Sequence, residues 1–173
     1  MQTPNRIDKA GPQAGRRADV TAVVHADGIE RAAAGRFVSS VRSLADASAH
    51  GPLEIAEAFD ERAARLTLTI RGGLPAVLRL LNGKSASDER LFEDGVDTSM
   101  AATVDGVGTV KAVAIGDHLL NAAKNHRPGG LPLDVRTEHD EGRAQLHVRL
   151  KGSLFATSYL LFLVNLHLTQ SRS

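Results

Sequence analysis

The chain contains no cysteine and no tryptophan, and only one tyrosine and five phenylalanines among its 173 residues. Without cysteine, disulfide bonds, thiol nucleophiles and thiolate metal ligands are excluded. Because 42% of the residues are still hydrophobic, a sizeable core is feasible, and it must be mostly aliphatic. The lack of cysteine is compatible with a reducing compartment, and we predict a cytoplasmic protein.

An excess of charge of either sign is also lacking. Lysine and arginine number 21 and aspartate and glutamate 20, which gives a net charge of +1. Such a balance does not indicate a nucleic-acid surface or any other strongly charged partner. The polar first 18 residues have no apolar centre of the kind a signal peptide needs, and we expect residues 1–18 to be a disordered tail.

The familiar catalytic and cofactor motifs are missing as well. The segment "DGVGTVK" has Gly106 and Gly108, but Lys111 stands where a dinucleotide fingerprint needs its third glycine. The stretch "GKS" at Gly83–Ser85 lacks the upstream glycine of a phosphate-binding loop and begins a linker, so we reject it, and no Gly-x-Ser-x-Gly elbow is present. His118 and His126 are eight residues apart, which is poor spacing for a helical metal site. We therefore predict no cofactor, no metal and no catalytic residue, and lean against an enzyme.

The chain does contain an internal sequence repeat. "PLEIAEAFDERAARLTLTIRGGL" from Pro52 aligns without a gap with "PLDVRTEHDEGRAQLHVRLKGSL" from Pro132, at an offset of 80 residues. A weaker likeness at an offset of 78 extends the match upstream. A fixed internal period of this kind indicates a duplicated structural unit. The pairs that are identical in the two phrases are Pro52/Pro132, Leu53/Leu133, Asp60/Asp140, Glu61/Glu141, Ala64/Ala144, Leu66/Leu146, Gly72/Gly152 and Leu74/Leu154.

Each phrase predicts a β-hairpin, because its apolar residues alternate with polar ones. With the turn at 60–63, Ile55 faces Leu68 and Leu53 faces Ile70. The same register in the second copy pairs Val135 with Val148 and Leu133 with Leu150. The Asp-Glu pair inside "EHDEG" recurs in the first copy, so we interpret it as part of a turn. Gly142 suits a positive φ angle and Arg62 does not, so the two turns are expected to differ in type.

Each hairpin is preceded by a strand and a helix and followed by another helix. The strands are "DVTAVVHADG" and "DTSMAATVDG", and Asp27 with Glu30 is typical of a helix N-terminus. The later helices are expected at 74–82 and 154–168, the second capped by Ser153. The fold class predicted is α+β: a tandem duplication of a strand–helix–strand–strand–helix unit, with antiparallel hairpins and helices on one sheet face. The repeats span 19–83 and 97–173 around an acidic linker at 84–96, and join edge to edge in one sheet or pack as two lobes.

This order of elements resembles that of small βαββα modules such as KH-like domains and the ring-building domains of secretion systems. The resemblance is one of topology. No Gly-x-x-Gly loop of the RNA-binding kind stands in the corresponding place.

The last helix is the strongest functional signal. "LFATSYLLFLVNLHL" has no Lys, Arg, Asp or Glu, yet at 1.5 Å per residue it spans only about 22 Å, too short for a membrane span. Either it is a central helix covered by both repeats, or it is an interface. Our leading hypothesis is a non-enzymatic interaction or assembly module that forms a homo-oligomer or binds a protein partner. The interface residues predicted are Leu154, Phe155, Tyr159, Phe162, Leu163 and Leu166.

The open face of the sheet supports an alternative function. It carries charged residues, which the predicted register pairs as Asp134 with Arg149 and Arg136 with His147. Solvated charge pairs explain them without a function, and a surface for nucleic acid or another anionic ligand is the functional alternative. The ligand-binding residues predicted there are Arg71, Arg136, His147, Arg149 and Lys151. A third hypothesis, an enzyme site between the repeats, would use Asp117 and His118.

Overall fold

A computed structural model describes residues 17–46, 51–82, 97–125 and 133–170. Two successive strand–helix–strand–strand–helix units make up the fold, which confirms the predicted α+β class and its duplication. The first unit is β1 (Ala18–Asp27), α1 (Arg31–Asp46), β2 (Leu53–Asp60), β3 (Arg65–Gly73) and α2 (Leu74–Asn82). The second is β4 (Asp97–Asp105), α3 (Thr109–Asn125), β5 (Asp134–Asp140), β6 (Gln145–Ser153) and α4 (Leu154–Gln170). Most of the predicted tail, the 84–96 linker and His126 lie outside the described residues.

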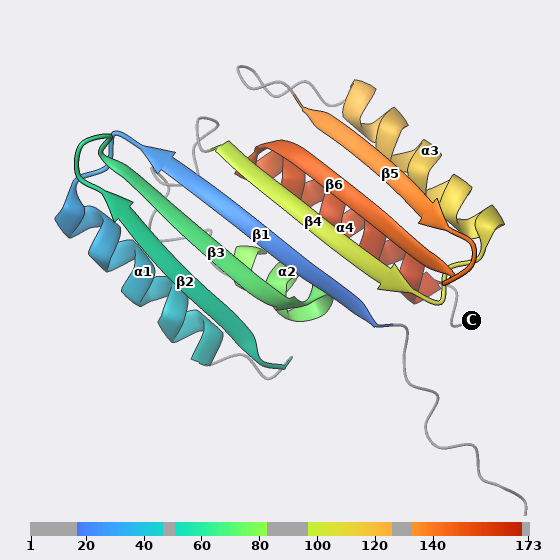
Figure 1. Cartoon of the computed structure of the whole chain (residues 1–173), viewed down its shortest axis with the longest axis horizontal. Helices are drawn as coiled ribbons and strands as arrows, with labels where there is room; N and C mark the ends of the chain where they lie inside the picture. The colour runs from blue at the N-terminus through green and yellow to red at the C-terminus, as the bar shows by residue number, and fades with distance from the viewer. Residues whose placement is uncertain (1–16, 47–50, 83–96, 126–132, 171–173) are drawn as a thin grey trace, which may run out of the picture.

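The six strands form one sheet in the order β2-β3-β1-β4-β6-β5 (Figure 1). The two units meet where β1 pairs antiparallel with β4, so the repeats join edge to edge. Ala22 lies opposite Met100 in this ladder, and by the 78-residue offset these two residues are each other's counterparts. An approximate twofold axis therefore passes between Ala22 and Met100. Joining the units this way buries one edge strand of each three-stranded half.

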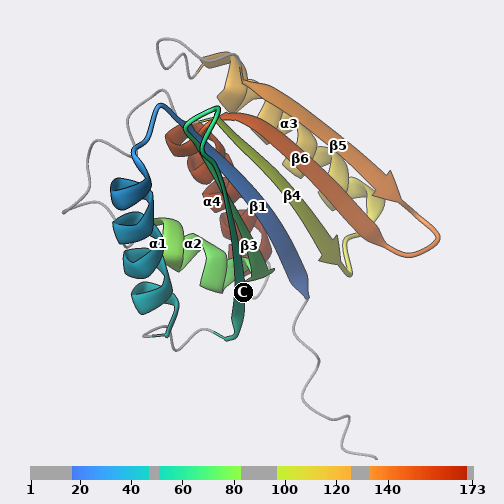
Figure 2. The same cartoon turned by 60° about the vertical axis from the view of Figure 1, so that its left-hand side comes forward.

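All four helices cover the same face of the sheet, as Figures 1 and 2 show. Strand residues alternate accordingly: Val20, Ala22 and Val24 of β1 are buried, while the residues between them are partly exposed. The core is aliphatic, as the composition predicts. Its largest fully buried side chains are Leu68, Ile70, Leu74, Ile115, Leu119, Leu146, Leu160 and Leu161. None of the four described helices covers the opposite face of the sheet, which we call the open face.

The predicted register of the hairpins is wrong by two residues. Ile55 faces Ile70 and Leu53 faces Gly72. In the second hairpin Val135 faces Leu150, and Thr137 faces Val148. The shift explains the glycine at position 72, because a Cβ atom there would lie only 2.5 Å from the side chain of Leu53. The apolar faces survive, because a shift of two residues keeps every side chain on its side of the sheet.

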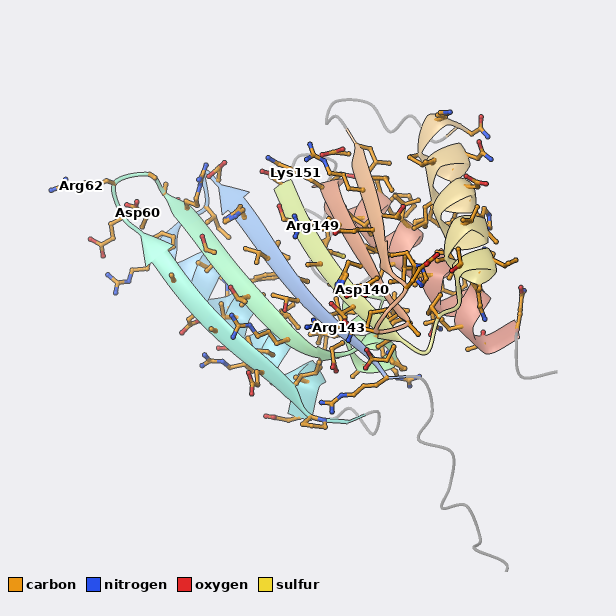
Figure 3. All side chains as sticks on the ribbon, turned by 45° about the vertical axis from the view of Figure 1, so that its right-hand side comes forward. Asp60, Arg62, Asp140, Arg143, Arg149 and Lys151 are labelled. Atoms are coloured by element: carbon orange, nitrogen blue, oxygen red, sulfur yellow. The ribbon has the colours of Figure 1, made fainter. Side chains whose placement is uncertain are left out.

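The two hairpin turns have the same design, contrary to the prediction that they differ. Asp60 accepts hydrogen bonds from the backbone N–H groups of Arg62 and Ala63, at 2.9 and 3.2 Å, and Asp140 accepts one from Arg143 at 3.1 Å. Figure 3 labels Asp60 and Arg62 at the first turn and Asp140 and Arg143 at the second. The positive φ angle falls not on Gly142 but on the last turn residue, Ala64 (47°) and Ala144 (49°). The Asp-Glu pair of "EHDEG" is thus part of a turn.

The carbonyl groups of these alanines fasten each turn to the start of a helix. Ala64 accepts a hydrogen bond from the N–H of Ile29 at 3.1 Å, and Ala144 accepts the equivalent bond from Val107 at 2.9 Å. A residue in the left-handed region directs its carbonyl group differently from its extended neighbours, so the strained φ angle serves this contact.

The helix starts agree with the sequence at one site and differ at another. Ser153 caps α4 as predicted, since its hydroxyl accepts a hydrogen bond from the N–H of Ala156 at 3.2 Å. Asp27, in contrast, is the last residue of β1 and pairs with Arg65 on β3 at 2.5 Å. Asp27 therefore belongs to the end of the β1–β3 pairing, and it does not cap α1, which begins at Arg31.

Candidate functional site

An aromatic stripe runs along the outer side of α4. We define it as Phe155, Tyr159 and Phe162, which are 61%, 41% and 40% exposed. Their spacing of four and three residues places them on one side of the helix. The other side packs into the core through Leu160, Leu161 and Val164. The helix is therefore apolar on its covered side and on its exposed side alike.

The six predicted interface residues divide between these two sides. Phe155, Tyr159 and Phe162 are exposed and Leu166 is half-buried. Leu154 and Leu163 are only 3% and 5% exposed, so the structure places them in the core of the chain itself. The apolar sequence alone could not separate the two sets, since large side chains surround the helix axis on every side.

The first repeat shows how unusual the stripe is. At the offset of 80 residues, its positions correspond to Pro75, Arg79 and Asn82 of α2. The exposed apolar residues of α3, namely Val110, Val113 and Leu120, correspond at the offset of 78 to Ala32, Gly35 and Arg42 of α1. Thus every large exposed apolar side chain of the described residues lies in the second repeat.

A groove of about 270 Å³ lies on the open face of the sheet, across the junction of the repeats. Arg149 and Lys151 of β6 stand on one side of it, and both are exposed (Figure 3). The remaining lining comes from β1, β4, β5 and β6: Thr21, Val23, Ser99, Met100, Ala101, Asp134 and Leu150. The groove therefore contains two of the five predicted ligand-binding residues.

The other three predicted ligand-binding residues lie outside this groove. Arg136 forms an ion pair with Asp134 at 3.2 Å. The ring of His147 lies within hydrogen-bond distance, 3.2 Å, of the Thr103 hydroxyl. Arg71 projects from β3 opposite Thr21. The predicted cross-strand pairs are also wrong: Asp134 faces Lys151, Arg136 faces Arg149, and Glu138 faces His147.

A second groove, of about 250 Å³, lies between α3 and the β5–β6 hairpin. Val113, Asp117, Leu120, Thr137 and His139 contribute to its lining. The close approach of the helix depends on Gly116, where a Cβ atom would lie 3.1 Å from the Thr137 hydroxyl. In the first repeat the corresponding seam carries an ion pair at 3.7 Å, between Arg42 and Glu57. The corresponding residues of the second repeat, Leu120 and Thr137, cannot form an ion pair.

Two histidines of the second repeat, His118 on α3 and His167 on α4, lie side by side. His118 does not line the α3–β5 groove with Asp117; its Nδ1 atom lies 2.7 Å from Nε2 of His167 on α4. Burial, the neighbouring His118 and the charge of Lys111 lower the pKa of His167 below its usual value. No group of three or more potential ligands forms a metal cluster within the described ranges. Sequence spacing could not reveal the His118–His167 pair, because the helices meet only in the folded chain.

Comparison with known proteins gives similarity of structure alone. No protein-family model matches the chain, and no curated protein matches it in sequence. The regulatory subunit of aspartate kinase from Thermus flavus is similar over 88% of this chain and 96% of its own, with 10% identity and a TM-score of 0.31. Aspartate kinase from Clostridium acetobutylicum is similar over 90% of this chain and 34% of its own, with 10% identity and a TM-score of 0.27. At these values the likeness carries no statement about function.

Within the described part of the chain, no helix combines the length and the apolar character needed to cross a bilayer.

Proposed function

We propose that the chain is a protein-interaction module that self-associates through the aromatic stripe of α4. The observation that carries this proposal is the contrast between Phe155, Tyr159 and Phe162 and their first-repeat counterparts Pro75, Arg79 and Asn82. The scaffold is the same in both repeats, so the fold does not require aromatic residues at these positions. Exposed aromatic side chains at consecutive helical turns are typical of protein interfaces.

A second copy of the chain is the partner that fits the stripe best. The helix from Leu154 to Gln170 has no Lys, Arg, Asp or Glu, so it offers a partner no charge to recognise. Recognition must then depend on apolar contact, and the same stripe on another copy provides it. Such a contact is self-complementary about a twofold axis, the commonest arrangement in homo-oligomers. Offset stacking between rings would add to the burial.

The size of the stripe limits the strength of the association. Three aromatic side chains, each about half exposed, present roughly 300 Å² per copy. A pair of copies would therefore bury about 600 Å² of aromatic surface, well below the roughly 1,200 Å² at which stable interfaces begin. We expect association in the micromolar range, strengthened by flanking residues such as Leu166.

Analytical ultracentrifugation of the full chain tests this function. Between about 1 and 100 µM, a range centred on micromolar affinity, the average mass should rise with concentration. Tyr159→Arg, which copies Arg79 of the first repeat, should abolish the rise and leave the circular dichroism spectrum unchanged. Arg79→Ala, the matched control on α2, should associate like the wild type. A wild-type chain that stays monomeric throughout this range would exclude self-association.

The alternative of nucleic-acid binding has less support. Single-strand binders combine basic residues with aromatic side chains on which bases stack. On the described strands no phenylalanine, tyrosine or tryptophan occupies an open-face position; Phe59 falls on the buried side, since it pairs with Leu66. The basic residues of the open face are better suited to a small anion.

A further inference from the structure

The groove on the open sheet face has the features of a binding site for a small anion. It is independent of the aromatic stripe, because the helices that include α4 cover the opposite face of the sheet. Both repeats contribute to it: Thr21 and Val23 from the first, and Ser99, Arg149 and Lys151 from the second. A site at the junction of two units can form only in the assembled six-stranded sheet.

The cations of this groove have no carboxylate partner among the described residues. Asp134, which also lines the groove, pairs with Arg136 at 3.2 Å, and no such pair is formed by Arg149 or Lys151. Arg149 and Lys151 are two residues apart on β6, so both side chains project from the same face about 7 Å apart at the backbone. Their head groups can therefore converge on one anion, and the arginine can bind a carboxylate or phosphate with two parallel hydrogen bonds.

The floor of the groove leaves room for a ligand with a compact body. Thr21, Ser99 and Ala101 are small side chains on the central strands, and Val23 adds an apolar surface beside them. The hydroxyl groups of Thr21 and Ser99 can donate to an anion. A volume of about 270 Å³ falls just below the range of roughly 300–1,000 Å³ of sites for drug-sized ligands. A molecule of the size of a small metabolite is indicated.

The approximate twofold symmetry supplies a built-in comparison. Lys151 corresponds to Arg71, but Arg149 corresponds to Thr69, so the related position in the first repeat has one cation instead of two. Thr21 and Ser99 are counterparts of each other and both carry a hydroxyl group. Arg149 therefore makes the two sides of the junction different.

We infer that this groove binds a small organic anion, a carboxylate or a phosphate monoester with a compact apolar body, held by Arg149 and Lys151. The apolar part lies against Val23 and Ala101, while the charged part faces the two cations. The inference does not depend on self-association, and either can fail without the other.

A titration of the ¹⁵N-labelled full chain at low salt tests the inference. The probes are benzoate, phenyl phosphate and the neutral benzyl alcohol, and the readout is amide shifts in a two-dimensional NMR spectrum. At least one anion should give saturable shifts at Ser99, Ala101 and Arg149, while benzyl alcohol should not. Saturation by benzoate, by phenyl phosphate or by both assigns the preferred anionic group. Lack of saturation by either anion, or equal binding of benzyl alcohol, would overturn the inference.

Two variants locate the site. Arg149→Thr, which copies Thr69 of the first repeat, should weaken binding about tenfold or more, because a charge-assisted contact is lost. Arg71→Thr is the matched control on the other side of the junction, and it should bind the probe like the wild type. Both positions are exposed on the sheet, and the spectra themselves report whether each variant is folded. Unchanged affinity in Arg149→Thr, or equal losses in both variants, would contradict binding in this groove.

Discussion

The Nδ1 atom of His25 lies 3.1 Å from the hydroxyl oxygen of Thr67 on the neighbouring strand. The equivalent place in the second repeat has the same pair with the residue types exchanged: Thr103 on β4 and His147 on β6, at 3.2 Å. The pairing is thus kept while its sequence is inverted. A residue-by-residue alignment of the repeats shows two mismatches where the folded chain has one recurring contact.

Exchanging the pair in the first repeat should therefore be tolerated better than changing one partner. His25→Thr and Thr67→His each remove the contact, and each should lower the free energy of unfolding by about 0.5 kcal/mol, as expected for a cross-strand pair. The double variant rebuilds the pair in the orientation of the second repeat and should recover most of the loss. Urea denaturation of the four chains measures this coupling. Strictly additive losses would show that the two side chains do not stabilise each other.

The sequence predicted the faces of the strands better than their pairing. Alternation of apolar residues identifies which side of a strand is buried, and the structure confirms the duplicated sheet that this pattern predicted. It cannot distinguish registers that differ by two residues, because both keep Leu68 and Ile70 on the buried side. The register depends on the turn, which runs from Asp60 to Arg65 and places its positive φ angle on an alanine. Positive φ angles favour glycine and not alanine, so the sequence pointed to Gly142 as the residue with a positive φ angle, and this prediction was wrong.

The positive φ angles of Ala64 and Ala144 predict that glycine would stabilise the fold at these two positions. Ala64→Gly and Ala144→Gly should each raise the free energy of unfolding by about 0.5–1 kcal/mol, because glycine adopts positive φ angles without the clash of a Cβ atom. The matched control is Ala63→Gly, one residue earlier in the same turn and without a positive φ angle. It should be neutral or destabilising. Chemical denaturation of the three variants checks the sign, and a loss at both Ala64 and Ala144 would contradict the assigned backbone conformation.

His167 predicts a dependence of stability on pH. Its pKa is lowered below about 6.5 by burial, by His118 and by Lys111. As the pH falls through 6.5, His167 becomes protonated in the unfolded chain before it does in the folded chain. The free energy of unfolding therefore decreases. His167→Gln should make this decrease shallower. Denaturation from about pH 8 to about pH 5.5 measures how the free energy of unfolding depends on pH. At the alkaline end the imidazole is neutral in both states, so a difference between the two chains there reports lost packing and not protonation.

If the slopes of the wild type and His167→Gln were the same, the pKa of His167 would not be lowered in the folded chain. A steeper slope in the variant would reverse the assigned direction of the pKa shift.

The candidate sites were only partly accessible to sequence reasoning. The absence of charge marked α4 as unusual. Which of its residues are exposed depends on the rotation of the helix about its own axis against the sheet, and this rotation places Leu154 and Leu163 in the core. On the open face, charge alone selected five residues. Only the register shows that Asp134 lies opposite Lys151. Only side-chain geometry shows that Asp134 pairs with Arg136, so that Arg149 has no carboxylate partner in the described part of the chain.

The single tyrosine of the chain lies in the middle of the proposed interface, and there is no tryptophan to mask its fluorescence. Tyr159 is 41% exposed in one copy, so a neutral quencher such as acrylamide reaches it in the monomer. Quenching measured at increasing protein concentration tests the central claim most directly. The account predicts that quenching falls as the mass measured by light scattering rises, with one midpoint for both. A rise in mass with no change in quenching, or a constant mass over the micromolar range, would contradict it.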